Sequence, residues 1–289
     1  MRSRRHLGPM PADGRGSRIA GDKVGPAEQP IDPIESGLAD GGAPARAVTI
    51  RAPNRFRRKL ESLVSLSASA GDQLERVTVR HDNHPTRADL IPRHDTQGGR
   101  LILMEGFACH YRTLTGGRRQ IIAYLVPGDS YDLDAPQHTR LGHEMMALTP
   151  VCVARLARAS VASVTRDYPA IAEGLRVAAQ VDEATVREWL VNIGGRPALE
   201  RIAHLFCELE LRLRAVGLAD ADRFDMPITQ YDLADTVGLS SVHVNRTLQE
   251  LRRQGLITLS GRSLTILNRP AFQAMADFQP DYLRLRKTG

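Results

Sequence analysis

Apolar residues recur at two different spacings along the chain, and the spacing divides it into regions. Between residues 56 and 165 they fall in short alternating runs, which predict β-strands because successive side chains of a strand point to opposite faces. The runs that we predict as strands are residues 74–79, 100–107, 109–114, 120–125 and 145–156. Turn signals such as Pro127-Gly128-Asp129 separate them. The pattern favours an antiparallel barrel or roll, preceded by a short amphipathic helix over residues 56–66.

From Pro169 the apolar spacing lengthens to three and four residues, which predicts a long helix. One row along it comprises Ile171, Leu175, Ala178, Asp182, Val186, Trp189 and Ile193, and a second partial row comprises Val177, Val181, Ala184 and Val191. Because so wide an apolar surface needs a partner as well as its own domain, we expect this helix to pair with its twin in a homodimer. The alternative is an internal core helix.

The segment from Asn192 to Pro197 interrupts this helical pattern. Gly194 and Gly195 permit a bend, and Pro197 can open the next helix, so the two glycines are the candidate hinge. That next helix is predicted over residues 198–216. Its apolar face carries Ile202, Leu205, Leu209 and Leu213.

Residues 228–251 carry the most informative pattern in the chain. Thr229 is predicted to cap a first helix, with Asp232 three residues later in a capping-box position. Gly238 lies where a turn between two helices needs a positive φ, and Ser240 is predicted to cap the second helix. The inward faces are apolar at Leu233, Val237, Leu239, Val244, Leu248 and Leu251. This arrangement predicts a helix-turn-helix that reads DNA.

Two short strands around a glycine turn follow the motif, at residues 255–259 and 263–266, and predict a wing. The residues expected to contact DNA lie at the helix starts, on the outward face of the second helix and at the wing tip: Thr229, Gln230, Ser240, Ser241, Val242, His243, Asn245, Arg246, Gln249 and Arg262. An ordinary helical hairpin, or a motif used only for protein contacts, is the alternative, and the wing argues against both.

Charge and composition agree with binding to nucleic acid. The formal net charge is +6, and from Ser240 to the end eight Lys and Arg stand against three Asp and Glu. The three cysteines form no C-x-x-C pair, so neither a disulfide framework nor a zinc or iron–sulfur site is predicted, and a reduced cytoplasm fits. No apolar run reaches the roughly 18 residues of a membrane span, and the N-terminus lacks the apolar stretch of a signal peptide.

Residues 1–55 contain no aromatic residue and are crowded with Pro, Gly, Arg, Ala and Asp. Such a segment buries too little apolar surface to offset its ordering entropy, so we expect a disordered tail. An arm that grips DNA through Arg2, Arg4 and Arg5 and a misplaced start codon are the alternatives to a solvated tail.

A β-roll, a long dimer helix, a glycine hinge and a terminal winged helix together resemble the Crp/Fnr family of bacterial transcription regulators, over about residues 56–289. The segment from Thr229 to Ile257 is the most specific part, and Pro127-Gly128-Asp129 resembles a turn of that family's roll. The resemblance implies an α+β fold with a cyclic-nucleotide-binding-like antiparallel β-roll. It also implies binding to double-stranded DNA as a homodimer, contact with RNA polymerase and a grip on DNA that responds to a small signal.

The expected domains are a tail over residues 1–55, the roll over 56–165, the dimerisation helix over 166–193 and the winged helix-turn-helix over 194–289. The sequence departs from the family in the roll. Members that bind cyclic AMP carry Gly-Glu-Leu and then Arg-Ser-Ala, whereas this chain has Ser130-Tyr131-Asp132-Leu133 and then Arg140-Leu141-Gly142. The cyclic-nucleotide site is therefore not recognisable. Arg140 lies one or two positions from the expected cation, so a small-ligand sensor with an offset pocket is the first rival.

The reading helix also departs from the family, because Val242 and His243 stand where similar proteins often show a glutamate. Arg246 matches the family's guanine-reading arginine, and Val242 favours an apolar contact with a thymine methyl. The DNA site is therefore expected to differ from that of the best-known members.

Other chemistry is weakly indicated. Histidines and acids at His81, His84, His94, Asp95, His138, His143 and Glu144 leave a metal-dependent cupin-like enzyme as a second rival, but the usual H-x-H spacing is missing. No phosphate loop, nucleophile elbow or paired carboxylates stand out. We therefore expect a cytoplasmic DNA-binding regulator that is not an enzyme and holds no metal or cofactor.

Overall fold

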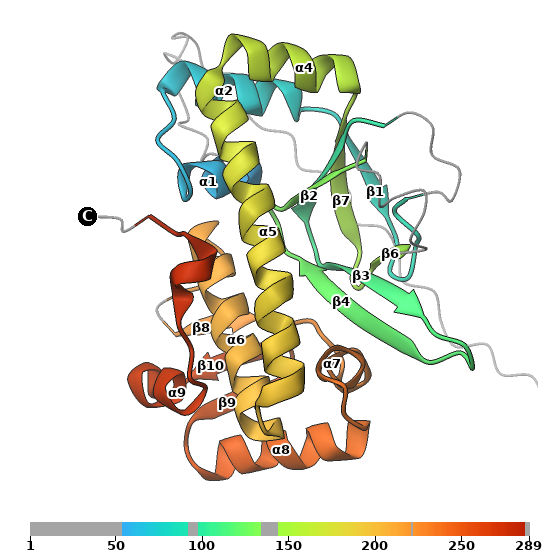
Figure 1. The fold of residues 1–289 in the computed structure, drawn as a ribbon, viewed down its shortest axis with the longest axis vertical. Coiled ribbons are helices and arrows are strands. Elements are labelled where there is room, and N and C mark those ends of the chain that lie inside the picture. Colours follow the sequence, from blue (N-terminus) through green and yellow to red (C-terminus); the bar gives the residue numbers. More distant parts are fainter. Residues whose placement is uncertain (1–53, 92–97, 134–143, 221, 287–289) are drawn as a thin grey trace, which may run out of the picture. The chain divides into compact units, whose positions relative to one another are not determined.

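The computed structural model describes residues 54–91, 98–133, 144–220 and 222–286 (Figure 1). All the described residues belong to one compact unit. The tail predicted for residues 1–55 lies almost wholly outside the described residues, as does Arg140.

Two antiparallel sheets form the roll (Figure 1). The first has the strand order β1 (His81–His84), β7 (Val151–Leu156), β2 (Arg100–Glu105) and β5 (Ser130–Asp132). The second has the order β4 (Arg119–Leu125), β3 (Ala108–Thr113) and β6 (Glu144–Ala147). The strands predicted at residues 100–107, 109–114 and 120–125 are thus confirmed, with ends shifted by one or two residues.

The prediction of one strand over residues 145–156 was wrong, because the chain turns between β6 and β7. The hydroxyl of Thr149 accepts a hydrogen bond from the Phe107 N–H at 2.9 Å, and Pro150 has no N–H to offer a ladder. One alternating run therefore supplies strands to both sheets.

The prediction of a strand over residues 74–79 was also wrong, because most of this run lies in helix α2 (Ala68–Val77). The Ser67 hydroxyl caps the helix by accepting from the Ala70 N–H at 3.2 Å. Ala70 and Leu74, four residues apart, are buried on one face. The short helix predicted over residues 56–66 is α1 (Arg55–Glu61), which ends earlier than expected.

Alternation along the strands produces two distinct apolar clusters. The inner faces of the two sheets share one cluster, which consists of Leu90, Leu101, Leu103, Ala108, Leu125, Leu133, Met145, Ala147, Val151 and Val153. The outer faces join a larger cluster that also includes residues from the helices and the C-terminal region. The roll therefore has a filled interior and an apolar back.

Helix α4 (Arg158–Asp167) leads into α5 (Pro169–Gly195), the long helix predicted from Pro169 (Figure 1). Helix α6 (Ala198–Ala215) follows and matches the predicted 198–216. It is buried on nearly every side, including charged residues Glu208, Glu210 and Arg212. No helix within the described ranges is long and apolar enough to cross a membrane.

The C-terminal region contains a small sheet and the two helices of the predicted motif. The sheet has the order β8 (Arg223–Asp225), β10 (Ser263–Ile266) and β9 (Ile257–Ser260). Helices α7 (Gln230–Val237) and α8 (Ser241–Arg253) precede the β9–β10 wing, and α9 (Arg269–Met275) and the 3-10 turn η1 (Pro280–Leu283) complete the region. Neither apolar spacing nor turn signals predicted β1, β5, α4, β8, α9 or η1.

Candidate nucleic-acid interface

A complete capping box starts α7. The Thr229 hydroxyl accepts from the Asp232 N–H at 3.1 Å, and Asp232 Oδ2 accepts from the Thr229 N–H at 3.3 Å. The same carboxylate oxygen also accepts from the Thr229 hydroxyl at 2.6 Å. The cap predicted from sequence is confirmed, and it uses the hydroxyl of a residue that was also expected to contact DNA.

The turn between α7 and α8 follows the predicted geometry. Gly238 has φ 67° in the left-handed region, which costs a residue with a Cβ considerably more than glycine. Its N–H donates to the Ala234 carbonyl, and the Leu239 N–H donates to the same oxygen. The Ser240 hydroxyl then caps α8 by accepting from the His243 N–H at 3.2 Å.

Helix α8 has one buried face and one open face. Val244, Thr247, Leu248 and Leu251 are buried, and α8 packs against α6, α7 and β9. The predicted reading residues Val242, His243, Asn245, Arg246 and Gln249 are exposed, and Ser241 is half-buried. Val242 is 62% exposed, so its side chain is accessible to a partner outside the chain. The structure thus gathers these residues at the surface of one helix.

The wing is present, and Arg262 follows Gly261 at its tip. The β9–β10 ladder pairs Ser260 with Ser263, and the Arg262 carbonyl accepts from the Met226 N–H at 2.7 Å. Arg262 is exposed and also borders a cleft beside the roll. Its position at the tip is confirmed, whereas its contact with a phosphate stays a prediction.

The long helix α5 divides its apolar rows between the interior and the surface. Ile171, Leu175, Ala178 and Trp189, all placed in the predicted dimer row, are buried within the chain. The prediction that they hold two chains together was therefore wrong. The large apolar residues that α5 exposes are Val186, Leu190 and Val191, which are 46%, 68% and 57% exposed.

The corner between α5 and α6 differs slightly from expectation. α5 runs through both Gly194 and Gly195, and the break comes at Arg196 and Pro197. A Cβ at either glycine would meet nothing within 4 Å, so packing does not require glycine there. Each glycine lowers helix stability by about 1 kcal/mol relative to alanine. Movement at this corner stays a prediction.

The described part of the roll interior is filled by the apolar cluster of the two sheets. Beside its apolar cluster the rings of His110 and Tyr131 lie 4.3 Å apart. A cyclic phosphate held there would need a cation, since a buried unpaired charge is costly. Arg140, the residue predicted to supply it from an offset position, lies outside the described residues.

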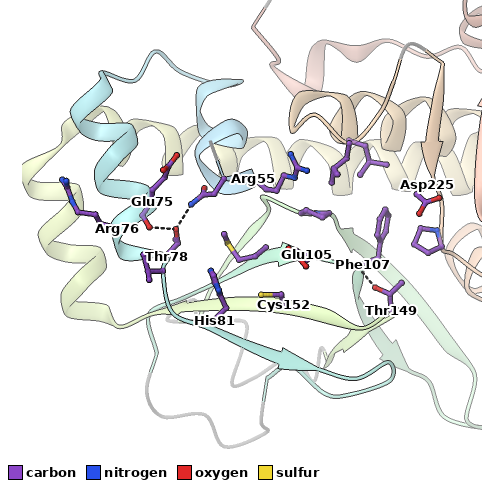
Figure 2. Close-up of a pocket in the computed structure, with 18 of the residues that line it drawn as sticks. Arg55, Glu75, Arg76, Thr78, His81, Glu105, Phe107, Thr149, Cys152 and Asp225 are labelled. Atoms are coloured by element: carbon purple, nitrogen blue, oxygen red, sulfur yellow. Dashed lines mark hydrogen bonds between the residues drawn. The ribbon is translucent and has the colours of Figure 1, made fainter. Parts of the chain in front are cut away.

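A cleft of about 1030 Å³ lies against the outer side of the roll (Figure 2). Glu75 and Arg76 of α2, Phe107 and Asp225 are among its lining residues. Its rim mixes acids and bases, so it has no single charge that would select an anion or a cation.

The proposed metal ligands are only partly described. His81 and His84 lie in β1 and Glu144 starts β6, whereas His94, Asp95, His138 and His143 lie outside the described residues. Within the part of the chain that the structure describes, no three His, Cys, Asp or Glu residues are grouped as a metal site requires.

The side chains through which the roll binds α7 were not predicted from the sequence. Asp232 is 2% exposed and pairs with Arg119 of β4 and with Arg87. Burial alone would raise the pKa of Asp232, but hydrogen bonds from Thr229 and Arg119 keep it below its ordinary value. No spacing in the sequence signals a pairing between residues more than a hundred positions apart.

Comparisons with known proteins agree on one kind of relative. Residues 200–275 match the model of the Crp-like helix-turn-helix domain. The chain is 27% identical over 168 residues to the transcriptional activator protein FnrL of Cereibacter sphaeroides, covering 57% of this chain and 67% of the relative. It is 26% identical over 174 residues to the nitrogen fixation regulation protein FixK of Bradyrhizobium diazoefficiens, covering 60% and 72%.

Solved structures share the fold. FixK2 from Bradyrhizobium japonicum superposes with a TM-score of 0.59 at 24% identity, covering 68% of this chain and 96% of that one. A mutant of CooA from Carboxydothermus hydrogenoformans gives a TM-score of 0.53 at 15% identity, covering 68% and 87%. At these identities the likeness supports the architecture of roll, long helix and winged helix.

Proposed function

Because the chain belongs to the Crp/Fnr family of DNA-binding transcription regulators, we propose that it acts as a homodimer whose two copies of α8 read one two-part DNA site. The observation that carries the reading role is the open face of α8, where exposed Asn245 and Arg246 follow a capped helix start. Side chains of this kind hydrogen-bond base edges in the major groove, and a helix N-terminus favours phosphate.

The reading helix α8 is held firmly by the elements around it. Helix α8 packs on α6 and α7, and Val244 and Leu251 are fully buried beneath its open face. Rigid support matters because a base contact is specific only when the side chain is held in register with the groove. We propose that Arg246 reads guanine and that Val242 contacts an apolar base feature.

Replacing Arg246 by alanine should weaken binding by about 1–3 kcal/mol per half-site and relax the preference at one base position. The measurement is selection of bound fragments from randomised DNA, followed by affinities for the selected site and its single-base variants. Arg252→Ala is the matched control, since Arg252 is exposed on the same helix and carries the same charge. An unchanged base profile in Arg246→Ala would remove the assignment.

The wing tip should behave differently from the reading helix. Arg262→Ala should weaken binding to all sequences alike and reduce the salt dependence of the affinity by about one phosphate contact, because a backbone contact carries no sequence information. Affinities measured across a salt series on selected and random DNA test this. A change in base preference would contradict a phosphate contact.

The exposed row on α5 supports pairing with a second copy. Positions Ala172, Ala179, Val186 and Ile193 recur every seven residues and all are at least partly exposed, with Leu190 beside them. A seven-residue apolar repeat is the spacing of a coiled-coil seam. We propose that this row joins the two chains. It keeps Val186 and Ile193 of the row predicted from sequence and leaves out its buried members, such as Leu175 and Trp189.

We further propose that the protein works in the cytoplasm, contacts RNA polymerase and has no catalytic role. A regulator that binds DNA at a promoter lies close to the RNA polymerase that binds the same promoter. The four domains expected from the sequence are kept, with the same limits, as a proposal. We propose Arg140 and its neighbours in the roll as the binding site of any small effector.

A further inference from the structure

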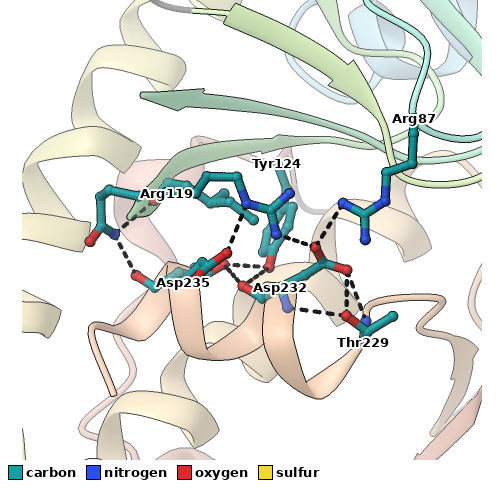
Figure 3. A network of polar contacts seen from close by, with 9 residues as sticks. Arg87, Arg119, Tyr124, Thr229, Asp232 and Asp235 are labelled. Carbon is teal, nitrogen blue, oxygen red and sulfur yellow. Dashed lines mark hydrogen bonds and ion pairs between the residues drawn. The ribbon is translucent and has the colours of Figure 1, made fainter. Parts of the chain in front are cut away.

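Strand β4 of the roll lies against α7, the first helix of the DNA-reading motif (Figure 3). Arg119 reaches from the start of β4 to two carboxylates one turn apart on α7. Its Nη2 pairs with Asp232 Oδ1, and its Nε donates to Asp235 Oδ2 at 2.8 Å. Arg87 approaches the same oxygen of Asp232 at 3.5 Å.

The Arg119 guanidinium is held in a fixed orientation. Its side chain is 18% exposed, and its Cζ lies 5.9 Å from the centre of the Tyr111 ring on the neighbouring strand. A planar guanidinium presents its donors to two acceptors in a rigid fork, whereas the donors of a lysine share one rotatable nitrogen and fix no orientation. The contact therefore fixes the direction of α7 and not only its distance from the roll.

Two further side chains of β4 extend the attachment toward the end of α7. The buried Tyr124 hydroxyl shares a hydrogen bond with the Thr236 hydroxyl and lies 3.3 Å from the Asp232 carbonyl. Gln120 Nε2 donates to the Thr236 carbonyl at 3.2 Å. Three side chains of β4 thus hold α7 from Asp232 to Thr236.

This attachment leaves the reading face open. The roll covers the side of α7 that carries Asp232 and Asp235, whereas Asn245 and Arg246 on α8 are exposed. Since α8 packs on α7, fixing α7 fixes the reading helix relative to the roll and the long helix. A contact that orients α7 without covering the exposed face of α8 is suited to positioning the reading helix on DNA and not to blocking it.

We propose that Arg119 is a positioning residue for DNA reading, which holds the reading helix in the orientation that two half-sites at one fixed spacing require. The proposal rests on the proposed function, because it concerns how the DNA site is read. It assigns to the hairpin β3–β4 a direct mechanical link to the helix-turn-helix that bypasses the glycine corner between α5 and α6.

The spacing between half-sites gives a readout that loss of folded protein would not move. Each base pair added between half-sites moves one of them by about 3.4 Å and turns it by about 35°. Rigidly held reading helices cannot follow such a change, whereas loosely held ones can. A lower fraction of folded protein would reduce binding equally at every spacing.

The test uses full-length protein and the palindromic site that the wild type selects from randomised DNA, with the spacer changed by one or two base pairs in either direction. Arg119→Ala should bind the best spacing about tenfold more weakly and should discriminate less between spacings. The affinity and the spacing discrimination of Arg119→Lys should lie between those of the wild type and Arg119→Ala. Arg118→Ala, which removes the same charge from the exposed neighbouring residue, should match the wild type.

A double-mutant cycle with Asp235→Asn links the effect to this contact. Asp235 has no part in the capping box, so its replacement leaves the start of α7 intact. The double variant should bind little worse than Arg119→Ala alone. Equal loss at every spacing, or tighter binding by Arg119→Ala at the best spacing, would overturn the positioning role. Failure of the wild type to select any DNA would instead overturn the proposed function.

Discussion

Replacing Asp129 by asparagine is expected to lower the free energy of unfolding by about 3–5 kcal/mol, because it leaves two buried cations without their shared anion. Asp129 Oδ1 pairs with Lys59 at 2.9 Å and Oδ2 pairs with Arg212 at 2.7 Å, and all three side chains are at most 8% exposed. Oδ2 also accepts from the Val126 N–H at 2.8 Å. The measurement is urea unfolding followed by tryptophan fluorescence.

The same site ties the turn of the roll to the base of the winged domain. Arg212 Nη1 donates to Glu208 at 2.9 Å, and Glu208 also accepts from the Trp189 indole at 2.9 Å and from the Tyr282 hydroxyl at 3.0 Å. This network of hydrogen bonds and ion pairs thus joins α1, the turn, α5, α6 and η1. Removing one member leaves the remaining groups buried without a partner, which destabilises the fold by their desolvation penalty.

The stability of the wild type should also depend on the charge of Asp129. Burial alone would raise its pKa, but Lys59 and Arg212 lower it to about 2. Because the folded pKa lies below the value of about 3.9 for an unfolded aspartate, this group stabilises the fold above pH 4. That contribution, about 3 kcal/mol, should be lost as the pH falls from about 4 to about 2, and Asp129→Asn should lack it.

An exposed ion pair provides the control. Arg176 and Glu173 on α5 are 56% and 49% exposed, so Arg176→Gln should change the free energy of unfolding by less than about 0.5 kcal/mol. A loss in Asp129→Asn no larger than this would show that the buried pair contributes nothing beyond a surface pair.

Replacing Val186 and Leu190 together by aspartate should give a monomer that binds the two-part DNA site at least about a hundredfold more weakly. The two changes place four negative charges in the proposed seam, where they face one another at low separation. Once the chains separate, the second half-site no longer binds as part of the same molecule. Sedimentation velocity measures the association state, and fluorescence anisotropy with the selected DNA measures affinity.

The folded chain itself should tolerate this change, since both side chains are largely exposed within one chain. The unfolding midpoint, measured at a concentration where the wild type is dissociated, should therefore be close to that of the wild type. Val191→Asp introduces the same charge at an exposed position of α5 that lies outside the seven-residue row, and should leave the dimer intact. A wild type that sediments as a monomer, or a double variant that stays dimeric, would rule out the seam.

The corresponding change at Leu175, which the apolar row suggests from sequence alone, would test something else. Leu175 is 9% exposed and packs within its own chain, so an aspartate there would destabilise the fold before it affected the dimer. Periodicity shows that a helix has an apolar side. It does not show whether that side meets another chain or the rest of the same one.

The sequence by itself determined the elements whose signals are local. Thr229, Gly238 and Ser240 act through atoms three or four residues away, so their capping and turn roles follow from residue type and spacing. The same holds for α5 and α6, where long apolar periods leave little choice. The reading face of α8 followed from these, because what is not buried in so short a motif must point outward.

Tertiary structure alone decided the features that depend on distant partners. Residues 74–77 became helix because a cap at Ser67 and a buried face outweighed an alternating pattern, and α6 buries Glu208 and Arg212 because their partners arrive from four other segments. Arg119 likewise appears in sequence as one more surface arginine. Its role depends on a pairing across more than a hundred residues, and such a pairing has no period or motif that a sequence could display.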